Sequence, residues 1–317
     1  MRVFFVKELY MIRYPMKLIP YARQMIWGGS AIKEKFSKPF IEDNIGESWE
    51  LTCRPEAQSI IENGPYAGRA LCDLLGCGYD FPLLIKFIDS HDRLSVQVHP
   101  DDDVCDDGGK PLGKTEMWYI IDADEDAHII YGLKEGFSVE DYAEMIADED
   151  FESGLLKVNV KKGDCFFIPA GQVHAIGKGI LLAEIQQNSD TTYRLYDYGR
   201  LDKDGNPREL HVDKALSVMR GYSDADIEAL RYSDGKADGC LANCDKFKCD
   251  LISVDEQERV SISSYDDFIA LIFIEGCGEI LCNGESYPAK AGDTFYIPHN
   301  LSINVCGTLK FISAKAK

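Results

Sequence analysis

Residues 162–176 read KGDCFFIPAGQVHAI, and residues 291–305, AGDTFYIPHNLSINV, align with them without gaps. Glycine, aspartate, phenylalanine, isoleucine and proline recur at matching positions: Gly163, Asp164, Phe166, Ile168 and Pro169 correspond to Gly292, Asp293, Phe295, Ile297 and Pro298. Each copy is typical of a turn followed by a strand that ends at proline. The repeat predicts two similar β-barrels in one chain.

The rest of the sequence also favours a mainly β fold. Short apolar strands follow one another between glycines and prolines, as in LSVQVH, EMWYIID, AHIIYG, ILLAEIQQ and DTFYIP. Helical spacing is confined to residues 65–76, 138–156, 213–219 and 223–231, with Ser138 and Asp141 as a candidate N-cap pair. We therefore expect one barrel with short helices in residues 1–220 and a second barrel in residues 235–317.

The composition limits the classes of partner. The chain has 317 residues, 45% of them hydrophobic, and a net charge of −20, which argues against nucleic acid and anionic membranes as partners. We see neither a secretion signal nor an apolar run of roughly 20 residues. The eleven cysteines are then expected to be reduced thiols of a cytoplasmic protein. Cys240, Cys244 and Cys249 are interpreted as structural thiols, because no C-x-x-C pair joins them.

The stretch SVQVHPDD (95–102) alternates apolar and polar residues. On a strand, Val96 and Val98 face one side, while Ser95, Gln97 and His99 face the other. A row of hydroxyl, amide and imidazole groups indicates one wall of a polar site.

The two copies of the repeat differ at one chemically important position. His174 in the first copy corresponds to Ile303 in the second. The spacing Gly163-x5-Pro169-x-Gly171-x2-His174 resembles the second motif of the cupins, jelly-roll barrels that often hold a metal. In such a barrel Gln97, His99 and Glu116 would point inward with His174, as an N/O set for one zinc or similar divalent ion. The second barrel is expected to be metal-free, and His128, His211 and His299 are interpreted as structural.

Several longer motifs resemble the type I mannose-6-phosphate isomerases. They are WGG (27–29), IGESWEL (45–51), FPLLIKFIDS (81–90), LSVQVHPDD (94–102), GKTEMWYI (113–120), GDCFFIPAGQVHAI (163–176) and AEIQQNSDTTYRLYDYGR (183–200). The resemblance extends over most of residues 20–215 and is closest to the short bacterial branch. It implies zinc bound by Gln97, His99, Glu116 and His174. It also implies interconversion of mannose 6-phosphate and fructose 6-phosphate through a cis-enediol.

Five further residues are candidates for this reaction. Lys114 shares the inward face of Glu116, where an ammonium group would stabilise an enediolate or move a proton. Glu184 follows the apolar run GILLA, so partial burial would raise its pKa and suit it to act as the base. Arg194 stands where the family has a catalytic arginine, and its guanidinium also suits an anionic substrate. Ser95 and Lys86 are candidates for binding the phosphate.

Two other functions remain open from the residues alone. His99, Glu116 and His174 without Gln97 form the ligand set of a non-haem iron oxygenase. A sugar-binding cupin without turnover is the other alternative. Oligomeric state is left open.

Overall fold

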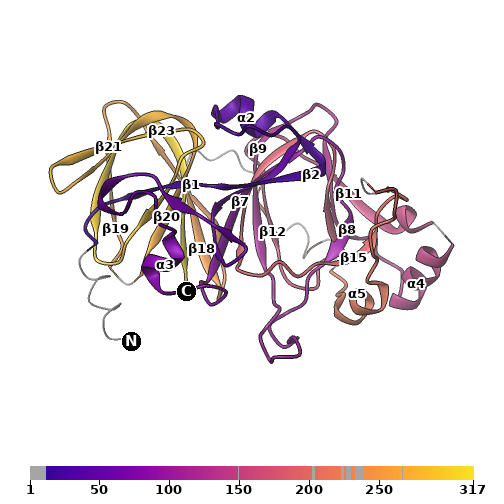
Figure 1. The fold of residues 1–317 in the computed structure, drawn as a ribbon. Helices are drawn as coiled ribbons and strands as arrows, with labels where there is room; N and C mark the ends of the chain where they lie inside the picture. The colour runs from indigo at the N-terminus through magenta and orange to yellow at the C-terminus, as the bar shows by residue number, and fades with distance from the viewer. Residues whose placement is uncertain are drawn as a thin grey trace.

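The computed structural model describes residues 12–148, 150–201, 204–222, 225, 230–232, 239–265 and 267–317. It has two β-rich lobes side by side, with helices confined to the edges (Figure 1). This confirms the prediction of a mainly β fold with few short helices.

The first lobe contains two antiparallel sheets. The larger has the order β16-β12-β9-β14-β7-β3-β2, and the smaller β11-β10-β13-β8-β15. The strands of the larger are β2 (Tyr21–Gly29), β3 (Ile45–Leu51), β7 (Leu83–Ser90), β9 (Glu116–Ala123), β12 (Cys165–Ile168), β14 (Ile180–Gln187) and β16 (Arg231–Tyr232). Those of the smaller are β8 (Val96–Val98), β10 (His128–Leu133), β11 (Leu155–Asn159), β13 (His174–Ile176) and β15 (Tyr193–Tyr196).

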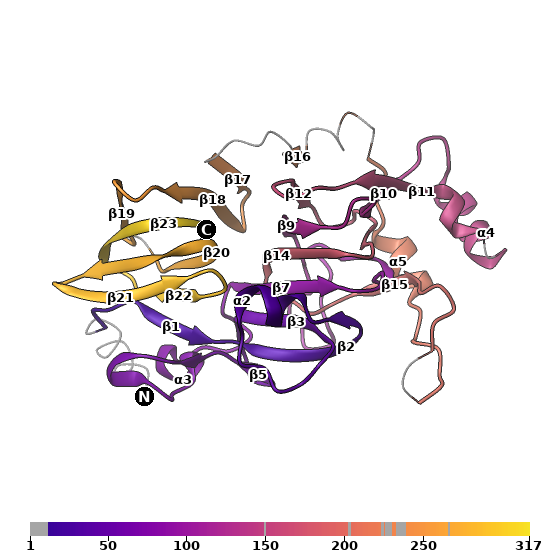
Figure 2. The ribbon, with the colours of Figure 1, turned by 90° about the horizontal axis from the view of Figure 1, so that it is seen from above.

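The second lobe is built on one sheet of order β17-β18-β23-β20-β22-β1-β6, with β19 paired to β23 and β21 to β20. Its strands from the C-terminal half are β17 (Gly239–Asn243), β18 (Phe247–Val254), β19 (Arg259–Ser263), β20 (Ile269–Cys282), β21 (Glu285–Lys290), β22 (Thr294–Ile297) and β23 (Ser302–Ala316). Two strands come from the start of the chain, β1 (Met16–Ile19) and β6 (Ile60–Ile61). Figure 2 shows β1 beside β22 in this lobe. The small pair β4 (Cys53–Arg54) and β5 (Ala57–Gln58) forms a separate hairpin.

Successive side chains of β7 point to opposite faces of the sheet, and one of these faces is that of the polar site. Ile85 and Phe87 belong to a core that also contains Ala270 and Tyr296 of the second lobe, so this face of β7 packs between the lobes. Lys86 points to the opposite face, toward the interior of the first lobe. A lysine in an apolar strand is thus accounted for by the two faces of the sheet.

The two copies of the repeat fold alike. Gly163 and Gly292 have φ of 93° and 90°, and the carboxylates of Asp164 and Asp293 each accept a hydrogen bond from a lysine amide three residues earlier, at 3.1 and 3.0 Å. Each turn leads into a strand, β12 or β22. The sequence repeat therefore corresponds to a turn-and-strand unit that occurs twice in the structure.

The predicted helices are shorter than their sequence patterns. Residues 65–76 give only the 3-10 turn η1 (Gly64–Tyr66) and α3 (Leu71–Leu75), with Gly68 between them at φ 83°. Residues 138–156 give α4 (Val139–Ala147), which begins with the predicted Ser138–Asp141 capping box, and η2 (Phe151–Gly154).

Two further helices complete the description. The segment 213–219 corresponds to α5 (Val212–Val218), and α2 (Ala31–Phe36) was not predicted. Most of the predicted helix 223–231 lies outside the described residues, and Arg231 begins β16. No described helix has the length and apolar character needed to span a membrane.

The eleven cysteines are all unpaired thiols. Cys240 is exposed, Cys244 is half-buried and Cys249 is buried. Over the described residues these three form no group with metal-ligand spacing.

Candidate metal centre and cavity

Three buried side chains converge between the two sheets of the first lobe. His99 follows β8, Glu116 begins β9, and His174 begins β13. The two histidine Nε2 atoms are 3.2 Å apart, and they lie 3.5 Å (His99) and 3.3 Å (His174) from the Glu116 carboxylate oxygens. Within the described residues this is the group of histidine, cysteine and carboxylate side chains with metal-ligand spacing.

Both imidazoles are oriented by the backbone. Nδ1 of His99 donates to the carbonyl of Thr191 at 2.8 Å, and Nδ1 of His174 donates to the carbonyl of Gln172 at 2.9 Å. Because Nδ1 carries the proton in each ring, Nε2 keeps its lone pair for a ligand bond. Burial lowers the pKa of His99 to about 3 and also lowers the pKa of His174. Both rings are therefore neutral, as metal ligands must be.

Glu116 supplies the negative charge of the group. Burial opposes its ionisation, but the neighbouring Lys114 ammonium holds the pKa of Glu116 well below its usual value. Lys114 Nζ lies 2.9 Å from the carboxylate and 3.1 Å from His99 Nε2. Lys114 is thus in contact with two of the candidate ligands.

Gln97 adds a fourth polar group. Its side-chain amide nitrogen lies 3.4 Å from His174 Nε2, and Gln97 pairs with His174 across β8 and β13. The two ends of a glutamine amide are nearly isosteric, so rotation about the last side-chain bond presents the oxygen at the same place.

The donor spacing tests whether a metal fits. Ligand atoms about 2.0–2.2 Å from a tetrahedral zinc lie about 3.3–3.6 Å from one another. The separations between His99, Glu116 and His174, 3.2 to 3.5 Å, match that geometry closely. Two neutral imidazoles and a carboxylate are also a suitable donor set. The residues present fit a divalent ion.

A cavity of about 290 Å³ opens beside this group. Its lining residues that carry charge or a polar group are Arg23, Glu47, Lys86, Ser95, Gln97, Lys114, Glu184, Asp190, Thr192, Arg194 and Arg208. The volume is close to the lower end of the range for small-molecule sites. Its five cations contrast with the net charge of −20 of the whole chain and provide the local attraction that an anionic ligand requires.

Two arginines stand together in the cavity wall. Arg194, on β15, donates from Nε to Ser95 Oγ at 3.2 Å and from Nη1 to the carbonyl of Glu209 at 2.7 Å. Arg208 donates from Nε to the buried carboxylate of Asp197 at 2.7 Å. These contacts hold both guanidinium groups in place, which favours recognition of an anion.

Comparisons with known proteins agree with this geometry. The family model for the phosphomannose isomerase type I catalytic domain matches residues 16–129. The chain is 38% identical over 301 residues to the mannose-6-phosphate isomerase ManA of Bacillus subtilis, covering 90% of this chain and 94% of that protein. It is 35% identical over 311 residues to the mannose-6-phosphate isomerase of Streptococcus mutans, covering 95% and 98%.

A solved structure shows the same relationship. The crystal structure of a Bacillus subtilis mannose 6-phosphate isomerase superposes with a TM-score of 0.84 at 34% identity, covering 95% of this chain and 99% of the other. The chain belongs to the type I phosphomannose isomerase family. Membership of this isomerase family argues against both alternatives that the sequence left open, the non-haem iron oxygenase and the sugar-binding cupin without turnover.

In the structure all nine predicted site residues lie in one region of the first lobe. His99, Glu116 and His174 form the candidate metal group with Gln97 beside it, and Ser95, Lys86, Lys114, Glu184 and Arg194 line the adjacent cavity. Lys86 is ion-paired with Glu184 at 3.0 Å, so its predicted role in phosphate binding stays a prediction. As expected, burial raises the pKa of Glu184, with Glu116 acting in the same direction.

Sequence reasoning missed several residues of the phosphomannose isomerase cavity. Glu47 on β3 accepts from Trp49 Nε1 at 2.7 Å, and Arg23 lies 3.4 Å from the same carboxylate oxygen. Burial opposes ionisation of Glu47, but Lys86 and Arg23 lower its pKa. The polar residues Glu47, Ser48 and Glu50 within the short strand IGESWEL were a usable signal. Arg208 lies in an irregular loop and offered none.

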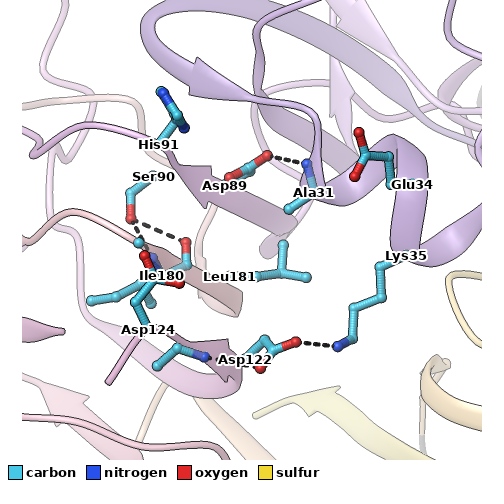
Figure 3. Close-up of a pocket in the computed structure, with 12 residues that line it drawn as sticks. Ala31, Glu34, Lys35, Asp89, Ser90, His91, Asp122, Asp124, Ile180 and Leu181 are labelled. Atoms are coloured by element: carbon cyan, nitrogen blue, oxygen red, sulfur yellow. Dashed lines mark hydrogen bonds and ion pairs between the residues drawn. The ribbon is translucent and has the colours of Figure 1, made fainter. Parts of the chain in front are cut away.

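A larger hollow of about 560 Å³ lies where β7 and β9 end and β14 begins (Figure 3). Its side chains mostly serve the fold: Asp89 accepts from the Ala31 amide at 2.6 Å, and Lys35 pairs with Asp122. Glu34 and Asp124 make it acidic. An acidic hollow repels a sugar phosphate, so the smaller basic cavity is the candidate active site.

Proposed function

We propose that this protein interconverts mannose 6-phosphate and fructose 6-phosphate, with one zinc ion held by Gln97, His99, Glu116 and His174. The observation that carries the proposal is a cation-rich cavity directly beside a buried His-Glu-His group. Family membership supplies the choice of sugar phosphate.

The reaction moves one proton between C1 and C2 of the open-chain sugar through a cis-enediol. When bound, the zinc ion polarises the carbonyl and hydroxyl oxygens as a Lewis acid. Glu184 accepts the proton from one carbon and returns it to the other. Lys114 donates to the oxygen on which negative charge develops, and the hydroxyl proton passes from the other oxygen to it, so that one carbonyl becomes a hydroxyl as the other hydroxyl becomes a carbonyl.

We propose that Arg194 contacts the substrate where negative charge develops in the transition state, and that Ser95 and Arg208 bind its anionic side. Arg194 pairs across strands with Gln97, so it stands next to the metal group as well as the cavity wall. Arg208 lines the same cavity from the loop after β15. Together they counter the repulsion between a dianionic substrate and an acidic protein.

We also propose that residues 1–220 form the metal-binding unit and residues 235–317 a metal-free one. Ile303, which replaces the histidine, is buried in an apolar core with Phe273 and Phe295, and among the described residues of this unit no group of side chains has metal-ligand spacing. The strands β1 and β6, although early in the chain, extend the sheet of the second unit.

A coupled assay with mannose 6-phosphate, combined with elemental analysis, tests the proposal. We expect turnover, about one zinc per chain, and loss of activity with a chelator that excess zinc reverses. His174→Ala should lose the metal and the activity together, whereas the exposed His299→Ala should keep both. Absence of turnover in the zinc-loaded wild type, or two zinc ions per chain, would refute it.

A further inference from the structure

Four buried side chains form one row across adjacent strands of the larger sheet. Trp118 on β9 is paired with Glu184 on β14, Glu184 with Lys86 on β7, and Lys86 with Trp49 on β3. Their exposed fractions are 1%, 3%, 3% and 1% in that order. A carboxylate and an ammonium group are therefore enclosed between two indole rings and reach solvent only through the cavity.

Each oxygen of the Glu184 carboxylate has its own neighbour. Trp118 Nε1 donates to Oε2 at 2.9 Å, and Lys86 Nζ lies 3.0 Å from Oε1. Lys86 is held in turn over the Trp49 ring, 5.4 Å from its centroid. Two fixed contacts on two oxygens define the plane of the carboxylate. Such control matters for a group that must meet a carbon-bound proton at a set angle.

We propose that Trp118 is a positioning residue for the isomerisation: its indole N–H holds the Glu184 carboxylate in the orientation, and in the ionised form, that proton transfer requires. The inference rests on the proposed function, in which Glu184 moves the proton. Trp118 acts on the proton transfer through Glu184, and its ring also packs edge-on against His174, 5.4 Å between ring centroids, which is why the zinc content is measured with every Trp118 variant.

The charges around Glu184 set the direction of the expected pH effect. Lys86 faces it from β7, Glu116 from β9 and Lys114 from the segment before β9. Beyond them, the charged groups of the cavity are Glu47 on β3, Arg23 on β2, Arg194 on β15, and Asp190 and Arg208 in loops.

The indole bond opposes the effect of burial. Burial and Glu116 raise the pKa of Glu184, while Lys86 and Lys114 lower it. A donated N–H favours the ionised carboxylate, so its loss raises the pKa further. The acid limb of kcat/KM, which reports the ionised base in the free enzyme, then moves to higher pH.

Trp118→Phe removes the N–H and keeps an aromatic ring. We expect the acid limb of kcat/KM for mannose 6-phosphate to move up by about one pH unit, the size of effect that one hydrogen bond to a charged group supplies. The zinc content should stay near one per chain. The matched control is Trp27→Phe. Trp27 belongs to the same apolar cluster as Trp118 and lies at the cavity, but the described residues give it no carboxylate partner. Its acid limb should not move.

An unmoved limb in Trp118→Phe, or an equal shift in Trp27→Phe, would overturn the inference. Should Trp118→Phe fail to fold, Glu184→Gln provides the second test, because its amide oxygen still accepts the indole N–H. That variant must lose the acid limb together with most of its turnover, and a retained limb would also overturn the inference. The wild type is measured first, so failure of the proposed isomerase activity would be recognised separately.

Discussion

Lys114 occupies an unusual position for a lysine, since its side chain is buried against the ligand group. Its ammonium contacts His99 and Glu116 and also lines the cavity. A buried cation at this point is well placed to stabilise negative charge on a substrate oxygen, because the surroundings screen it weakly.

Lys114→Met tests that role directly. We expect kcat to fall by about 10² or more, the contribution typical of a charge-stabilising or proton-transfer group, while zinc content stays near normal. Steady-state kinetics and elemental analysis measure both. Lys110→Met, four residues earlier on an exposed loop, is the control and should remain within about twofold in kcat. Loss of zinc from Lys114→Met would instead show that Lys114 maintains the ligand geometry.

Arg194→Lys separates charge from geometry. Lysine keeps the charge but loses the guanidinium fork that contacts Ser95 and Glu209. We expect kcat to fall by about 10-fold or more with little change in KM, because Arg194 is paired with Gln97 beside the metal group. Arg208→Lys, in the same cavity wall but not paired with a residue of the metal group, should chiefly raise KM. If kcat and KM of Arg194→Lys both stay within about twofold of wild type, Arg194 is not part of the active site.

The turn that precedes β12 has the same backbone conformation as the turn that precedes β22, but the two turns have different neighbours. Gly163 and Gly292 share a left-handed backbone, but their surroundings differ. A Cβ on Gly163 would meet nothing within 4 Å, whereas a Cβ on Gly292 would stand 2.4 Å from Cβ of Phe36 in α2. The second turn is therefore also a packing contact.

The alanine variants of these two glycines should differ in stability. Gly163→Ala meets only the backbone strain and should lower the free energy of unfolding by about 1 kcal/mol. Gly292→Ala adds a steric clash and should cost about 2 kcal/mol or more in total. Urea denaturation of both variants measures the difference. Equal losses would mean that α2 shifts freely to accommodate the extra methyl group.

The two lobes are joined by a buried polar contact as well as by the shared apolar core. Glu50 of β3 receives hydrogen bonds from Lys38 Nζ at 2.7 Å, from Ser48 at 2.6 Å and from Thr294 of β22 at 3.2 Å. The side chain of Glu50 is fully buried. Because both lobes contribute donors, we expect them to unfold together.

Removing Lys38 should destabilise the whole protein. Lys38→Met leaves the Glu50 carboxylate buried without its cation, which typically costs about 3 kcal/mol or more. The control is Lys33→Met, which breaks the exposed pair of Lys33 with Asp43 and should change stability by under about 0.5 kcal/mol. Denaturant unfolding followed by tryptophan fluorescence provides the measurement. Equal stability of the two variants would contradict a structural role for the Glu50 contact.

Much of the site was predictable because strands alternate with a period of two. The pattern SVQVH placed Ser95, Gln97 and His99 on one face, and the repeat spacing placed His174 at the start of a strand. The correspondence of His174 with Ile303 likewise predicted which copy of the repeat would carry candidate ligands, and the structure has His174 in the His-Glu-His group and Ile303 in an apolar core. These are properties of neighbours along the chain, and periodicity reports them reliably.

Contacts between distant segments were not available from the sequence. The pairing of Lys86 with Glu184, the indole bond from Trp118 and the meeting of Arg194 with Ser95 depend on which strands lie side by side and in which register. The use of β1 in the sheet of the second lobe depends on the same choice. Register is set by the summed burial of whole sheets and not by any local pattern. The candidate ligand residues could therefore be predicted from the chain, while the neighbours that set their orientation and charge required the folded molecule.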